Sequence, residues 1–178
     1  MNVVQTKLDG CVIIEPKVFG DDRGFFLETF QAERYAQQAE ITLPFVQDNH
    51  SRSSIGVLRG LHYQKKKPQG KLVRVVRGAV FDVAVDIRKG SRTFGQWEGI
   101  VLSEDNKKQI WVPPDFAHGF LLLSETADFE YKCTDYYDPS DEGCILWNDP
   151  DLDIPWPIDN PTLSDKDAHA TRLVDLEL

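Results

Sequence analysis

Short apolar runs with a period of two recur along this chain, and they constrain its fold more than any other feature. In the clearest run, 79–88, apolar side chains occupy alternate positions, while Asp82 and Asp86 fall on the opposite face. Such alternation is typical of β-strands, whose successive side chains point to opposite faces of a sheet. Gly, Pro, Asn and Asp interrupt the runs at intervals of roughly ten residues, as turns do in all-β domains. The sequence therefore predicts a β-sandwich, barrel or jelly roll.

The segments with this strand pattern are 11–14, 24–30, 45–51, 57–64, 71–77, 79–88, 94–103, 109–112, 119–124 and 129–137. Short helices are expected only at 31–39 and 164–171. The proline-rich stretch 149–161, together with Trp147 and Trp156, predicts an ordered wrap over the surface of the domain. Because the chain has 178 residues, we expect a single domain, 1–178.

Composition argues against several classes of protein. The formal net charge of −9 disfavours a nucleic-acid-binding protein, which needs a basic face. Cys11, Cys133 and Cys144 are odd in number and lack CxxC spacing, as expected of thiols in a reducing compartment. No apolar run approaches membrane length, and the first residues lack a signal-peptide pattern. We therefore expect a cytoplasmic protein that binds neither membrane nor nucleic acid.

The predicted strand 57–64 carries two polar groups, Arg59 and His62, on an otherwise apolar ribbon. Their odd spacing would place them on opposite faces of a regular strand. Gly60 lies between them, and a glycine inside a strand often marks a bulge. We expect a kink at Gly60 that turns both side chains toward one cavity. The alternative is an edge strand with a solvated Arg59 and a hydrogen-bonded surface His62.

Other polar residues also allow both a structural and a functional interpretation. Arg23, near Phe25 and Glu28, is either a turn residue or a binding group. Gln47, Asp48 and Asn49 are either turn formers at a strand end or amides and a carboxylate suited to a base or a sugar.

The remaining candidates lie later in the chain. Lys71 is either solvated or faces a ligand, and His118 is either a core histidine or a cavity group. Tyr131 and Tyr137 would share a face of the strand 129–137, where a phenol can act as a general acid. Asp167 is either the partner of Ser164 in a capping box or the orienting group of a histidine.

A metal site is disfavoured by the sequence. A metal-dependent cupin would carry a second histidine two positions after His62, but Gln64 stands there and the lysines 65–67 follow. A cluster of cations disfavours a bound cation. We expect no metal and no cofactor.

Taken together, these pieces resemble the dTDP-4-dehydrorhamnose 3,5-epimerase family. The resemblance covers nearly the whole chain and rests on FGDDRGFF (19–26), QDNHS (47–51), VLRGLHYQ (57–64), PQGKLV (68–73), VPPDFAHGF (112–120), YKCTDYY (131–137) and LSDKD (163–167). It implies a cupin-like jelly roll without metal or nicotinamide. It also implies a homodimer whose N-terminal strands cross to the partner, bringing Arg23, Phe25 and Glu28 into the neighbour's site.

The resemblance further implies roles for individual residues. His62 would be the base, oriented by Asp167 or alternatively by Asp82, while Lys71 would stabilise an enolate and Tyr131 would return a proton. Arg59, Arg23 and Lys166 would bind the diphosphate, and Tyr137 would stack on thymine. The substrate-binding set is completed by Glu28, Gln47, Asp48, Asn49, His118 and Glu142.

The activity implied is epimerisation at C3 and C5 of dTDP-4-dehydro-6-deoxy-D-glucose to dTDP-4-dehydro-L-rhamnose, in dTDP-L-rhamnose biosynthesis. The alternatives are an enzyme that epimerises one carbon or isomerises the ketone, a metal-dependent cupin, and a non-catalytic module that binds sugar nucleotides.

Overall fold

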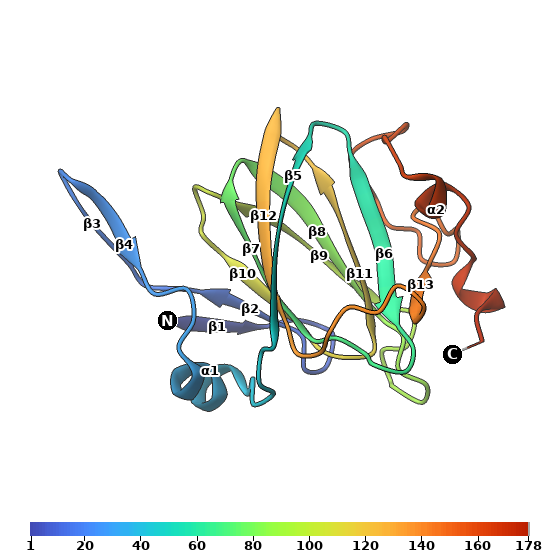
Figure 1. Ribbon diagram of the computed structural model, residues 1–178, viewed down its shortest axis with the longest axis horizontal. Coiled ribbons are helices and arrows are strands. Elements are labelled where there is room, and N and C mark those ends of the chain that lie inside the picture. Colours follow the sequence, from blue (N-terminus) through green and yellow to red (C-terminus); the bar gives the residue numbers. More distant parts are fainter. Residues whose placement is uncertain (178) are drawn as a thin grey trace.

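Two antiparallel β-sheets form a sandwich in the computed structural model, which describes residues 1–177 (Figure 1). The first sheet contains, in spatial order, β1 (Asn2–Gln5), β2 (Val12–Glu15), β10 (Gln109–Val112), β7 (Lys71–Arg77), β12 (Thr126–Cys133) and β5 (Gln47–Ser54). The second contains β13 (Glu142–Cys144), β6 (Leu58–Gln64), β11 (Phe116–Leu122), β8 (Ala79–Asp86) and β9 (Trp97–Ser103). The predicted all-β, cupin-like architecture is confirmed.

Few elements lie outside the two sheets. They are the hairpin of β3 (Val18–Asp21) and β4 (Gly24–Leu27), the helices α1 (Ala32–Ala39) and α2 (Asp165–Ala168), and a 3₁₀ turn at Leu173–Asp175. In Figure 1 the β3–β4 hairpin projects away from the sandwich, at the upper left. No helix among residues 1–177 has the length and apolar character needed to cross a membrane.

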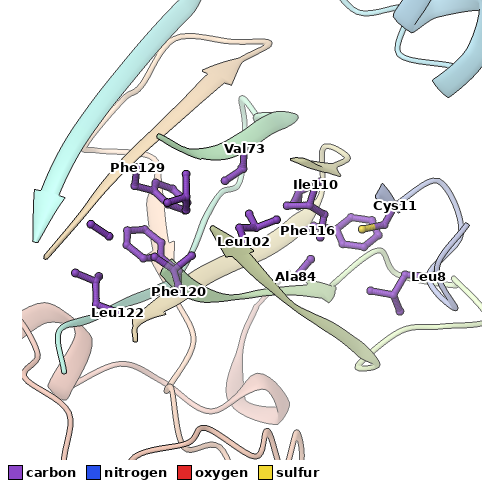
Figure 2. Close-up of a cluster of buried hydrophobic side chains, with 14 residues drawn as sticks. Leu8, Cys11, Val73, Ala84, Leu102, Ile110, Phe116, Phe120, Leu122 and Phe129 are labelled. Atoms are coloured by element: carbon purple, nitrogen blue, oxygen red, sulfur yellow. The ribbon is translucent and has the colours of Figure 1, made fainter. Parts of the chain in front are cut away.

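The main core lies between the sheets (Figure 2). Phe120 of β11 and Phe129 of β12 stack there with ring centroids 3.8 Å apart, and so join one sheet to the other. The alternation in β8 explains which side chains reach this core. Val80 and Ala84 pack into it, whereas Val83 packs on the outer face of the same sheet.

The outer face of each sheet is also covered. On the first sheet, Tyr35 of α1 packs with Ile14 and Trp111. On the second, the predicted wrap is present: Leu152 and Trp156 are buried against the sheet, and the Trp156 indole N–H donates to the Trp147 carbonyl at 2.8 Å. Burying such a side chain contributes roughly 1.5–3 kcal/mol.

Most predicted strands are present with shifted ends, and the helix expected at 31–39 is α1. The helix expected at 164–171 is shorter, because α2 ends at Ala168. Strands β1, β3 and β13 were not predicted. Placing Tyr131 and Tyr137 on one strand was wrong, because β12 ends at Cys133 and a turn follows, in which the Asp138 carboxylate accepts from the Ser140 backbone N–H at 2.9 Å.

Candidate active site

A cavity of about 360 Å³, which we call the central cavity, opens between the two sheets. Both sheets contribute to its walls, and Phe120 and Phe129 join it to the hydrophobic core. The polar side chains that line it are Gln47, Asn49, Ser51, Arg59, His62, Gln69, Lys71, His118, Tyr131, Tyr137 and Glu142.

The kink in β6 brings Arg59 and His62 to this cavity, as predicted. Gly60 has a φ of +116°, and the pairing of β6 with β11 shifts register at this point. A Cβ at Gly60 would lie 2.6 Å from the Gly119 Cα, so only glycine fits. The edge-strand alternative is wrong, because β6 lies between β13 and β11.

His62 forms a dyad with Asp167. His62 Nε2 lies 2.6 Å from Asp167 Oδ1, and the Asp167 side chain is only 3% exposed. Since a carboxylate can only accept, Nε2 carries the proton of this bond and Nδ1 is left as the basic nitrogen. Burial by itself raises the pKa of Asp167, but the hydrogen bond and charge of His62, with Ser164 and Cys144, hold it below the usual value.

Helix α2 sets the position of this carboxylate. Ser164 is the N-cap, and its hydroxyl accepts from the Asp167 backbone N–H at 3.2 Å. Ser164 caps the helix, but the Asp167 carboxylate bonds His62, as in the orienting interpretation, and does not act as the reciprocal group of a capping box. The backbone is capped by Ser164, while the side chain is free to bind His62.

The alternative that Asp82 orients His62 is wrong. Asp82 is fully buried and its two carboxylate oxygens lie 3.0 and 2.9 Å from His118 Nε2. The sheet order explains this pairing, because β8 and β6 lie on opposite sides of β11. His118 is buried and also lines the cavity. It is therefore both the core histidine and the cavity group that the sequence offered as alternatives.

Lys71 and Tyr131 line the cavity from the first sheet, whereas His62 lines it from the second. Burial lowers the pKa of Lys71, against the opposing charges of Cys133, Glu142 and Asp82. Burial raises the pKa of Tyr131 to about 12, so its phenol holds a proton at neutral pH. Acidic and basic groups thus face one another across the cavity.

A polar cluster at the rim is centred on Glu142. Its Oε2 accepts hydrogen bonds from the Tyr137 hydroxyl at 2.8 Å and from Lys166 Nζ at 2.7 Å. Its Oε1 lies 3.7 Å from His62 Nδ1. Burial raises the pKa of Glu142, but the bonds from Lys166 and Tyr137 and the His62 charge bring it below its usual value.

Four predicted substrate-binding residues lie away from the central cavity of this chain. Arg23 and Phe25 are on the exposed β3–β4 hairpin, where Arg23 pairs with Asp21. Glu28 pairs with Arg34, and Asp48 pairs with Lys132.

Sequence reasoning also missed some residues at the site. Ser51 and Gln69 line the central cavity. Ser51 continues the alternation of Gln47 and Asn49, which was a signal that could have identified it. Cys144, whose Sγ lies 3.5 Å from Asp167 Oδ1, carried no such signal.

Comparison with known proteins identifies the family. A family model described as dTDP-4-dehydrorhamnose 3,5-epimerase matches residues 5–175. The chain is also 53% identical to the dTDP-4-dehydrorhamnose 3,5-epimerase of Shigella flexneri over 178 residues, which cover 99% of this chain and 98% of that protein. The chain belongs to the dTDP-4-dehydrorhamnose 3,5-epimerase family.

Solved structures agree with this membership. The dTDP-6-deoxy-D-glucose-3,5-epimerase of Legionella pneumophila, in complex with dTDP-4-keto-L-rhamnose, matches with a TM-score of 0.96 and 58% identity, over 99% of this chain and 94% of that chain. A 3'-monoepimerase of Streptomyces bikiniensis, in complex with dTDP-quinovose, matches with a TM-score of 0.90 and 35% identity, over 96% and 87%. The predicted family is confirmed.

Proposed function

We propose that the central cavity epimerises C3 and C5 of dTDP-4-dehydro-6-deoxy-D-glucose, giving dTDP-4-dehydro-L-rhamnose for dTDP-L-rhamnose biosynthesis. The observation that carries the proposal is the His62–Asp167 hydrogen bond of 2.6 Å in a cavity that also holds Lys71 and Tyr131. Relatives of this activity are 53% identical, and the Legionella structure holds the corresponding 4-keto sugar nucleotide.

The chemistry begins with a carbon acid. The hydrogens on C3 and C5 are acidic because both carbons are bonded to the C4 carbonyl. The negative charge left by deprotonation is delocalised onto the 4-keto oxygen. His62 Nδ1 takes the proton, and the electron pair of the C–H bond moves into the enolate. Asp167 keeps the Nε2 proton in place and stabilises the imidazolium that forms. General-base catalysis of this kind contributes about 10²–10⁴-fold.

The enolate and its reprotonation are assigned to the opposite wall. The Lys71 ammonium would stabilise the enolate oxygen, and one such oriented donor contributes about 3–4 kcal/mol. Tyr131 would then deliver its phenolic proton to the carbon from the face opposite His62, which inverts the centre. Proton exchange with solvent resets both groups for the second carbon.

Nucleotide binding is assigned to the rim and to residues of both sheets. Arg59 and a partner-derived Arg23 would bind the diphosphate, since guanidinium and phosphate geometries match, and Lys166 would contribute an ammonium charge. Tyr137 would stack on thymine. Contacts to the sugar and the nucleoside would come from Gln47, Asn49, His118 and Glu142 of this chain and from a partner-derived Glu28.

A homodimer with exchanged N-terminal hairpins completes the proposal. A two-stranded hairpin is marginally stable alone, and this one exposes Phe19, Phe25 and Phe26 at 53%, 63% and 70%. Such aromatic exposure is typical of a surface that a partner covers.

Mixed dimers of Arg23→Ala and His62→Ala subunits should regain activity, because one of the two shared sites would then be intact. Failure to regain it, with mixed dimers present, would contradict the exchange.

A cytoplasmic location is also proposed, and the three free cysteines support it.

Deuterium uptake tests the reaction. In D₂O, the wild-type protein should exchange C3 and C5 of dTDP-4-dehydro-6-deoxyglucose, as followed by NMR, and His62→Ala should not. Exchange at one carbon only would favour the alternative function, a single-carbon epimerase. The similarity to the Streptomyces 3'-monoepimerase supports that alternative. Binding of dTDP without exchange would indicate a non-catalytic module.

A further inference from the structure

We propose that His62, Cys144 and Asp167 form a binding site for Zn²⁺, and that occupation of this site reversibly inhibits the enzyme. One ligand atom from each residue lies within 4.8 Å of the others. The metal is an inhibitor in this proposal, since the epimerisation proposed above uses none. The inhibition rests on that proposed function, whereas the binding does not.

The backbone brings the three residues together. Cys144 of β13 and His62 of β6 are direct cross-strand partners, so their side chains emerge on the same face of the sheet. Asp167 approaches from α2, held there by its Ser164 cap. Its Oδ1 is the shared partner, 2.6 Å from His62 Nε2 and 3.5 Å from Cys144 Sγ.

The two separations from Asp167 Oδ1 are close to those of a zinc site. Zn²⁺ binds Cys sulfur at about 2.3 Å and His nitrogen or carboxylate oxygen at about 2.0–2.2 Å, in tetrahedral geometry. Two such ligands then lie about 3.3–3.7 Å apart. The Cys144–Asp167 distance already fits, and the His62–Asp167 distance must widen by somewhat less than 1 Å.

The charges also balance. Zn²⁺ would displace the Cys144 thiol proton, which is released, and the His62 proton would move from Nε2 to Nδ1 as Nε2 binds the metal. A thiolate, a carboxylate and a neutral imidazole then neutralise the ion. The fourth position is left to water, and the ion can arrive through the central cavity that His62 lines.

The consequence for catalysis is direct. The metal would occupy Nε2 and break the hydrogen bond that orients His62 toward Asp167.

The test uses the chelator-treated full chain. Co²⁺, a spectroscopic substitute for Zn²⁺, should bind one equivalent per subunit with thiolate charge-transfer absorption, measured without substrate because a diphosphate also binds metal. Cys144→Ser, which keeps a donor for Asp167, should lose that absorption and raise the Zn²⁺ concentration for half-inhibition by about tenfold or more. His169→Gln removes an exposed histidine next to α2 and should behave as wild type.

Two results would overturn the proposal: no thiolate absorption in the wild-type protein, or equal Zn²⁺ inhibition of wild type and Cys144→Ser. If the protein showed no epimerase activity at all, the Co²⁺ titration would still decide whether the site binds metal. Failure of the proposed function and failure of this site are thus separable.

Discussion

The two walls of the central cavity differ in whether their titratable side chains have hydrogen-bonding partners within the protein. On the second sheet, His62 is held by a buried carboxylate, and His118 is likewise bonded to Asp82. On the first sheet, Lys71 has no carboxylate oxygen within 4 Å among residues 1–177, and the Tyr131 hydroxyl makes no hydrogen bond within that range. The base is oriented before substrate arrives, whereas the cation and the acid await partners that the substrate supplies.

This difference has an energetic reason. An orienting hydrogen bond fixes the tautomer and position of a base at little cost to stability. A desolvated and unpaired cation is destabilising in the empty protein, but it interacts most strongly when an anion develops beside it. The paired wall should therefore support both folding and catalysis, and the unpaired wall should favour catalysis at the expense of folding.

The largest effect is expected from removing the base on the paired wall. His62→Ala should lower kcat by about 10³-fold or more, because no other group replaces the abstracting nitrogen. Turnover measured by coupled reduction of the product would show the loss. Binding of dTDP, measured by calorimetry, should change little. A residual rate within tenfold of wild type would assign the base elsewhere.

Lys71→Met tests the unpaired wall. We expect kcat to fall about 10²–10³-fold, while the free energy of unfolding rises by about 1 kcal/mol as a desolvated charge is removed. Urea denaturation and steady-state kinetics on the same samples would measure both changes. A variant that is both less stable and less active would show that Lys71 is required for folding. That result would contradict the proposed difference between the two walls of the cavity.

The same contrast predicts responses at opposite ends of the pH scale, although both contributions to stability rise with pH. The pKa of Lys71 is lowered in the folded protein, so the unfolded chain binds more protons as pH approaches 10, and its contribution to stability rises there. The pKa of Asp167 is also lowered, so its stabilisation is present above about pH 4 and is lost as pH falls through the folded value. Unfolding curves of wild type, Lys71→Met and Asp167→Asn at both pH extremes would reveal each contribution. The corresponding slope should vanish in the matching variant.

Tyr131→Phe should lower formation of the epimerised product by about 10²-fold and leave stability nearly unchanged. Since His62 remains, wash-in of solvent deuterium at C3 should be affected less than product formation. Equal loss of both would place Tyr131 in binding or in proton abstraction, and not in reprotonation.

The smallest effect is expected at the cap that supports the paired wall. Ser164→Ala should lower the free energy of unfolding by about 1 kcal/mol, the usual cost of losing an N-cap side chain. Activity should fall only a few-fold, because Asp167 is still bound to His62. Ser164→Asp, which can also cap, should restore both quantities. No change in either would mean that α2 is positioned by packing alone.

The sequence by itself determined much of this protein. Alternating apolar residues identified most strands, because the period of a strand is a local property. Gly60 identified the kink, since only glycine accepts a φ of +116° in contact with β11. The motifs around Arg59, Lys71 and Tyr131 indicated the family.

Tertiary structure alone decided which polar groups meet. Asp82 was an alternative to Asp167 as the partner of His62 until the order β6-β11-β8 assigned Asp82 to His118. Tyr137 lies outside the strand of Tyr131, which ends at Cys133, and its backbone N–H donates to the Gln47 side chain at 2.9 Å. Cys144 came to lie beside the dyad only through the pairing of β13 with β6. Contacts between residues far apart in sequence depend on sheet order and register, which the periodicity of a single strand does not contain.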